Sequence, residues 1–173
     1  MEPQPSIVNN LMRKLPIIEM ILLAILACGL LAHYLEVSQA GSLVTLALGG
    51  LAGIFFLSAY IPPEKKQTDQ MEVKPGFADL LFATILPKFL WLSCAICALG
   101  LLFFQMDTDN DGYKMMLMIH SVITPGAVIL VGLGSVRGVQ GASLLFPVLI
   151  RAVSLFIVAA YLIRAEITGL FGG

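Results

Sequence analysis

Long apolar runs alternate along this chain with short stretches that carry most of the charges. Each run holds about 20 residues, and a helix of that length crosses the ~30 Å hydrocarbon core of a bilayer. Helices are the form expected there, because the hydrocarbon offers no water to bond exposed backbone amides. The pattern therefore predicts an all-α, polytopic membrane helical bundle of about five transmembrane helices. The runs cover 15–35, 41–61, 83–105, 114–136 and 143–163.

Composition agrees with a membrane environment. Of 173 residues, 58% are hydrophobic and 12% are charged, against roughly 25% charged in a soluble domain. The net charge of −1 argues against a basic nucleic-acid-binding protein. We interpret the first run as a transmembrane helix and not as a signal peptide, because it is longer than a signal's apolar region.

The basic residues predict the orientation, since Lys and Arg concentrate on the cytoplasmic side of membrane helices. Lys114 and Arg164 fall on one side of the predicted bundle, and seven others fall on the opposite side. The amino terminus and the 62–82 linker are therefore expected in the cytoplasm, and the loop around 107–112 outside it. The seven are Arg13, Lys14, Lys65, Lys66, Lys74, Lys88 and Arg137.

The first and third runs match each other at an offset of 71 residues without a gap. Pro and Gly at fixed register indicate a duplicated unit more strongly than apolar matches do. The matches include Leu15-Pro16 with Leu86-Pro87, Gly29-Leu30-Leu31 with Gly100-Leu101-Leu102, and Gly41 with Gly112. The predicted parts are a cytoplasmic segment 1–14, a first hairpin 15–61, the linker 62–82, a second hairpin 83–136, a fifth helix 143–165 and a tail 166–173.

Two short stretches resemble a known family. The run FFLSAYIPPE at 55–64 closes the second apolar run, and GLLAH at 29–33 closes the first. Both resemble the two-helix membrane domain of the GldL-type family, subunits of the gliding-motility and type 9 secretion motor of Bacteroidota. The resemblance covers 15–64, with a weaker second copy at 86–136.

The resemblance implies a duplicated relative in a bacterial inner membrane, with the 107–112 loop in the periplasm. It does not imply motor activity. Motor members of the family carry a glutamate in the second helix, where this chain has Leu51. The first outer turn, 36–41, also departs from the family's usual sequence.

Charges inside the predicted membrane region are the strongest candidate for a site, because they are costly there. Arg151 lies about eight residues into the fifth run, ~12 Å deep. Glu19 and Lys88 lie near the cytoplasmic ends of the first and third runs. Three interpretations stay open: a structural ion pair between Arg151 and Glu19, a proton or anion site, and an unpaired arginine that extends to the membrane surface.

The loop DTDNDG at 107–112 begins like a calcium-binding EF-hand loop. Asp107, Asp109 and Asp111 occupy the first three ligand positions and Gly112 the invariant glycine, but Met118 stands where the bidentate glutamate belongs. The loop therefore predicts at most a weak calcium site. The alternative is an acidic, solvated turn.

Histidines and cysteines offer two further candidates. His33 and His120 both fall toward the outer leaflet, as two axial ligands of a b-type haem do, although each is also an ordinary interfacial or helix-bridging residue. Cys94 and Cys97 form a CxxC pair typical of thiol redox proteins, but Cys28 is the one other cysteine. A ridge of small residues for close helix packing is the competing interpretation.

Helix-breaking residues give a last pattern. Thr124-Pro125-Gly126 predicts a kink in the fourth run, either for packing or as part of a discontinuous transporter helix. Glycines that suit helix contacts lie at Gly49, Gly50, Gly53, Gly132 and Gly134.

These patterns favour a non-enzymatic role. We expect a small integral subunit or scaffold of a cell-envelope complex, in contact with membrane lipid and with other integral subunits or copies of itself. No cofactor is expected apart from weakly bound calcium. An ion-coupled transport or motor component is the alternative, and a haem or thiol redox protein is a further one.

Overall fold

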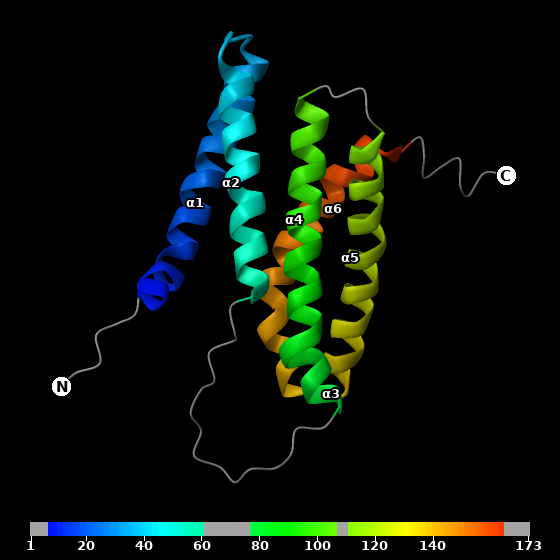
Figure 1. The fold of residues 1–173 in the computed structure, drawn as a ribbon. Coiled ribbons are helices and arrows are strands. Elements are labelled where there is room, and N and C mark those ends of the chain that lie inside the picture. Colours follow the sequence, from blue (N-terminus) through cyan, green and yellow to red (C-terminus); the bar gives the residue numbers. More distant parts are fainter. Residues whose placement is uncertain (1–6, 61–76, 107–110, 165–173) are drawn as a thin grey trace, which may run out of the picture.

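The computed structural model describes residues 7–60, 77–106 and 111–164, and this part of the chain is helical with no strand (Figure 1). Two helical hairpins stand side by side, and the last helix runs obliquely behind the second hairpin (Figure 1). The predicted all-α bundle is confirmed. The elements are α1 (Ile7–Tyr34), α2 (Ala40–Tyr60), α3 (Phe77–Leu80), the π-helical turn η1 (Leu81–Ile85), α4 (Leu86–Gln105), α5 (Gly112–Val136), the 3-10 turn η2 (Gln140–Leu145) and α6 (Phe146–Leu162).

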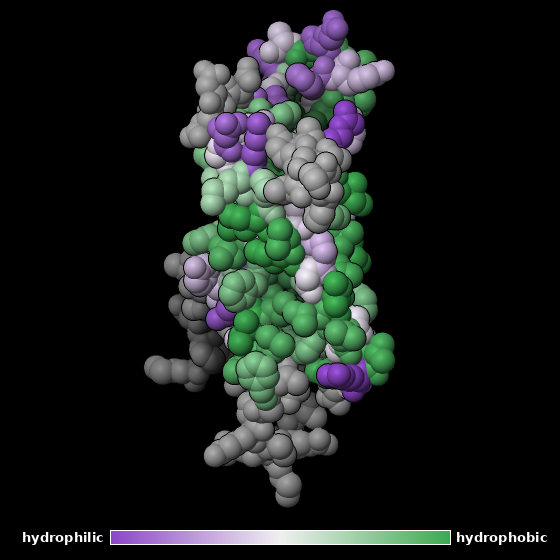
Figure 2. All heavy atoms as spheres, turned by 90° about the vertical axis from the view of Figure 1, so that its right-hand side faces the viewer, coloured by the Kyte–Doolittle hydropathy of each residue, from purple (hydrophilic) through white to green (hydrophobic). Residues whose placement is uncertain are grey.

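Within the described residues, four helical stretches are long and apolar enough to cross a membrane: Lys14–Tyr34, Ala40–Tyr60, Leu81–Gln105 and Gly112–Val136. Figure 2 shows a broad apolar band around the middle of one face, with hydrophilic residues gathered above it. The fifth helix, α6, has 17 residues, or ~26 Å at 1.5 Å per residue. It is shorter than predicted because the chain forms η2 first, and Pro147, which has no amide hydrogen, lies in the first turn of α6.

The two prolines matched by the 71-residue offset are used differently. Helix α1 begins at Ile7, so Pro16 lies inside it and not at its start. Pro87 lies in the first turn of α4, directly after the π-helical turn η1. A proline ring crowds the carbonyl four residues earlier, which here belongs to η1, and the wider π-turn relieves that crowding.

The two glycines matched by the same offset have equivalent places. A Cβ on Gly29 would lie 3.0 Å from Cγ2 of Val44, across the first hairpin. A Cβ on Gly100 would lie 3.0 Å from Cδ2 of Leu117, across the second. Each glycine therefore lets the two helices of its hairpin approach closely. The common origin of the hairpins stays a prediction.

The turn that ends α1 depends on a glutamate. Glu36 has φ 57°, in the left-handed region, and the amide of Val37 donates to the carbonyl of Ala32 at 3.0 Å. This is the bonding pattern of a helix end that usually takes glycine. Gly41, expected at the end of the turn, lies inside the first turn of α2.

Helix α1 lies at the edge of the bundle. In its most apolar window 17% of residues are buried, against 44% in the spans Ala40–Tyr60 and Leu81–Gln105. It packs mainly on α2, whereas α6 packs on α4 and α5. The space between α1 and α6, which α2 and α4 close on one side, is therefore only partly filled by side chains.

Candidate functional site

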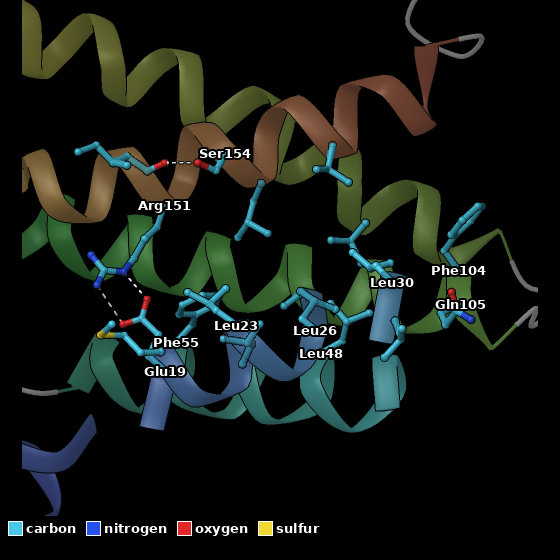
Figure 3. A pocket seen from close by; sticks show the side chains of 18 of the residues that line it. Glu19, Leu23, Leu26, Leu30, Leu48, Phe55, Phe104, Gln105, Arg151 and Ser154 are labelled. Carbon is cyan, nitrogen blue, oxygen red and sulfur yellow. Dashed lines mark hydrogen bonds and ion pairs between the residues drawn. The ribbon is translucent and has the colours of Figure 1, made fainter. Parts of the chain in front are cut away.

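Helices α1 and α6 are joined by an ion pair. Nη2 of Arg151, on α6, donates to Oε2 of Glu19, on α1, at 3.0 Å, and Nε of Arg151 donates to Oε1 (Figure 3). The Glu19 side chain is 6% exposed and that of Arg151 is 34% exposed. Two parallel bonds of this kind hold a carboxylate in a fixed orientation. The predicted pairing of these residues is present, and Lys88, exposed near the start of α4, lies outside it.

Arg151 is held by further contacts. Its Nη1 donates to the carbonyl of Pro147 at 2.7 Å. Its guanidinium carbon lies 5.6 Å from the centre of the Trp91 ring, and that ring lies 5.7 Å from the ring of Phe55. A cation over an indole face is favourable, and more so away from water. The arginine therefore contacts α1 and α4 from α6.

An elongated groove begins at this ion pair. It has a volume of about 830 Å³ and runs between α1 and α6 over a floor of α2 and α4. Apolar side chains such as Leu23, Leu26 and Leu48 form most of the wall, as Figure 3 shows. Its polar side chains lie toward the two ends: Glu19, Arg151 and Ser154 at one, and Gln105 at the other (Figure 3).

A second polar cluster lies inside the bundle around His120. The histidine, Ser93 and Thr124 are each at most 1% exposed. Nε2 of His120 lies 3.0 Å from the carbonyl oxygen of Ala152 and 3.3 Å from Oγ1 of Thr124. Nδ1 lies 2.7 Å from Oγ of Ser93.

These contacts assign the hydrogen bonds of the ring. A carbonyl oxygen only accepts, so Nε2 of His120 carries a hydrogen and donates to Ala152. In the neutral ring Nδ1 then accepts from the hydroxyl of Ser93. The cluster ties α5 to α4 and α6, as the helix-bridging interpretation predicted. His33 is exposed at the end of α1, whereas His120 is buried, and the pairing of the two histidines by a haem stays a prediction.

Two of the three cysteines, both on α4, are packed in the core. Cys94 and Cys97 are buried free thiols, and Cys28 is an exposed one. Sγ of Cys97 lies 4.0 Å from the carbonyl oxygen of Leu155, within the range of a weak bond to sulfur. The small residues of this part of α4 are buried, as the packing-ridge interpretation expected: Ser93, Cys94, Ala95, Ala98 and Gly100.

The acidic loop lies largely outside the described residues, since it includes Asp107 and Asp109. Asp111 is described. It pairs with Lys114 at 3.1 Å, and its side chain is 87% exposed. In the described ranges no group of three His, Cys, Asp or Glu residues is placed to hold a metal ion, so the weak calcium site stays a prediction.

Helix α5 continues through Pro125 as one helix and is therefore not discontinuous there, and the kink expected at Thr124-Pro125-Gly126 stays a prediction. Thr124 beside it is used in the His120 cluster. The groove, the contact of Trp91 with Arg151, and the roles of Ser93 and Thr124 were missed from the sequence. The spacing of His120 and Thr124, four residues apart on one helix, was the available signal.

Comparison with protein-family models, with curated proteins and with solved structures finds no match to this chain. The class of protein follows from the fold alone. The chain is an all-α bundle whose apolar helices indicate a membrane protein, with a polar cluster in its core and an ion pair at one end of an apolar groove.

Proposed function

We propose that this protein is a non-enzymatic integral subunit or scaffold of a bacterial cell-envelope complex. The observation that carries the proposal is the outward face of α2. No atom of the described residues would lie within 4 Å of a Cβ on Gly49 or Gly53, whereas a Cβ on Gly50 would lie 2.8 Å from Leu22. Gly50 therefore packs against a side chain of the same chain, whereas Gly49 and Gly53 pack against none among the described residues.

The uncovered glycines are four residues apart, and large apolar side chains flank them. Leu46 is 63% exposed and Tyr60 is 66% exposed on the same helix. Lipid tails are as apolar as these side chains, so helices associate in a membrane where small residues allow close backbone approach. This face suits a helix of another integral subunit or of a second copy.

The proposed orientation has the amino terminus in the cytoplasm of a bacterial inner membrane. Helices α1 and α4 begin, and α2 and α5 end, at one end of the bundle (Figure 1). Lys14, Lys88 and Arg137 belong to that end, and Lys114 and Arg164 to the other. The excess of positive charge at one end supports the proposal.

An ancestry shared with the GldL-type family remains part of the proposal, without motor activity. Leu51, where motor members have a glutamate, is 2% exposed in the apolar core. The equivalent packing of Gly29 and Gly100 supports a duplicated hairpin.

Co-purification tests the subunit role. The chain is tagged at its amino terminus and extracted in mild detergent, and its companions are identified by mass spectrometry and counted against the chain. We expect stoichiometric membrane partners, which Gly53→Leu removes and Gly132→Leu retains. Gly132 is the matched control, because a Cβ there also has no atom within 4 Å in the part of the chain that the structure describes. A wild-type chain that purifies alone and monomeric overturns the proposal.

Ion-coupled transport is the second candidate, and the position of Glu19 favours it. The Glu19 side chain is 6% exposed and lines the groove. Against it, both carboxylate oxygens bond one guanidinium, which suits a fixed structural pair. In vesicles, transport predicts an ion flux that Glu19→Gln abolishes while folded protein persists, and no flux in the wild type removes this candidate.

A further inference from the structure

Helix α6 makes polar contacts to two different helices at two consecutive residues. The side chain of Arg151 bonds Glu19 on α1 (Figure 3). The carbonyl of the next residue, Ala152, lies 3.0 Å from Nε2 of His120 on α5. The rest of the buried face of α6 is apolar, and in lipid an apolar helix face has little preference for protein over lipid tails. The contacts at 151 and 152 therefore fix the position of α6 more firmly than its apolar face does.

Helix α4 contacts the same two sites. The Trp91 ring centre lies 5.6 Å from the guanidinium carbon of Arg151, and two residues further on Ser93 bonds His120 at 2.7 Å. The ion pair and the His120 cluster are thus bridged through α6 and again through α4. Ala152, Ser93 and His120 are buried, and a close-packed interior transmits small displacements. A displacement at one polar site therefore reaches the other.

The His120 ring has a second acceptor within reach. Its Nε2–H donates to the carbonyl of Ala152 at 3.0 Å, and Oγ1 of Thr124 lies 3.3 Å from the same nitrogen. Thr124 belongs to α5, as His120 does, so a bond between them does not depend on the position of α6. A hydroxyl accepts as well as donates. The ring can keep a hydrogen bond when the carbonyl of Ala152 moves away, and it avoids the cost of a buried unpaired donor.

Arg151 supplies a reason for α6 to move. When Glu19 loses its charge or its contact, the guanidinium becomes an unpaired charge in apolar surroundings, which is costly. A long arginine side chain then extends toward water, and its side chain is already 34% exposed. Its backbone is drawn with it, together with the carbonyl of Ala152 one residue further on.

We infer that His120 is a hydrogen-bond switch controlled by the ion pair. While Glu19 bonds Arg151, Nε2–H of His120 bonds α6 through Ala152. When the ion pair opens, this bond passes to Thr124 and α6 is free to shift. A change of charge at Glu19 is thereby converted into a change in the packing of α6 on α5. The switch is independent of the proposed subunit role, because it does not use the glycine face of α2.

The ring nitrogens of His120 report the switch directly. The full chain, purified in detergent micelles, is labelled with ¹⁵N in its histidine rings, and nuclear magnetic resonance records their chemical shifts. The chain has two histidines, and His33→Gln identifies the resonances of His120. We expect the Nε2 resonance of His120 to differ between the wild type and Glu19→Ala by more than its line width, because the shift depends on the acceptor.

Two further variants separate the ion pair from a general loosening of α1. Glu19→Gln removes the charge and keeps the size of the side chain, so it should move the resonance in the same direction as Glu19→Ala. Ile21→Ala is the matched control, because Ile21 lies two residues further along α1 and is 54% exposed. It should leave the resonance at its wild-type position. Circular dichroism confirms that each variant is folded.

Thr124→Val tests the second acceptor. In this background the bond to Ala152 has no substitute, so Glu19→Ala should leave the His120 resonance in place and lower the melting temperature more than it does in the wild type. Two results would overturn the inference. A resonance unchanged in both Glu19→Ala and Glu19→Gln means that the ion pair does not control His120. An equal displacement with and without the hydroxyl of Thr124 means that Thr124 is not the second acceptor.

Discussion

Arg151 and Glu19 stand 132 residues apart in the chain, yet two hydrogen bonds join them across the bundle. The pair connects α6 to α1, which otherwise packs mainly on α2. It also forms one end of the groove. A buried charge in an apolar setting requires a partner, so this contact governs both the attachment of α1 and the shape of the candidate site.

Removing one partner of this pair should destabilise the fold. We expect Glu19→Ala to lower the free energy of unfolding by about 1–3 kcal/mol, less than for a fully buried pair because Arg151 remains 34% exposed. Thermal unfolding in detergent, followed by circular dichroism, measures the loss. The pair of Asp111 and Lys114, in which the Asp111 side chain is 87% exposed, is the control, and Asp111→Ala should cost less than ~1 kcal/mol.

The double variant Glu19→Leu/Arg151→Leu tests whether the unpaired arginine causes the loss of stability in Glu19→Ala. Two leucines leave no uncompensated charge, so this variant should recover most of the stability lost in Glu19→Ala. A double variant as unstable as the single one would mean that the ion pair itself, and not the unpaired arginine, accounts for the loss.

Two serines should respond differently to loss of the hydroxyl. Ser93 bonds the buried His120 at 2.7 Å, and Ser93→Ala leaves Nδ1 of the ring without a donor, at a cost of about 1–3 kcal/mol. Oγ of Ser121 is buried with no hydrogen-bond partner in the described part of the chain, so Ser121→Ala should be neutral or stabilising. Unfolding of both variants in detergent measures the difference, and equal losses would contradict the assigned role of the cluster.

The hairpin glycines should tolerate a methyl group poorly. A Cβ at position 100 also lies 3.1 Å from Cβ of Met116, and such overpacking costs about 1–3 kcal/mol. We expect Gly29→Ala and Gly100→Ala to destabilise by similar amounts. Gly53→Ala should instead gain up to ~1 kcal/mol from helix propensity, because no described residue lies within 4 Å of its Cβ. Melting temperatures of the three variants test this order, and a stable Gly100→Ala would be inconsistent with it.

Calcium should raise the melting temperature if the acidic loop binds it. About 10 mM calcium exceeds the dissociation constants of weak extracellular calcium sites. The wild type is expected to respond and Asp107→Ala/Asp109→Ala is not. The same response to magnesium, or an equal response in the double variant, would assign the effect to general screening of charge.

Much of the architecture could be read from the sequence. Runs of about 20 apolar residues form helices in a membrane, because the backbone N–H and C=O groups must form their hydrogen bonds with each other. The described helices match those runs closely. The pair of Glu19 and Arg151 could also be anticipated, since two opposite charges at similar depth favour each other over lipid. The match of Gly29 with Gly100 indicated a duplicated unit, but not that each glycine lies at the contact between the two helices of its hairpin.

The tertiary structure alone decided how these parts are used. It separated Gly50, which contacts Leu22, from Gly49 and Gly53, which face outward. It placed His120 in the core and His33 on the surface, and it left a groove between α1 and α6. In a lipid solvent every face of an apolar helix is acceptable. The sequence therefore determines where the long apolar helices form, but the packing of side chains across helices determines which face meets which neighbour.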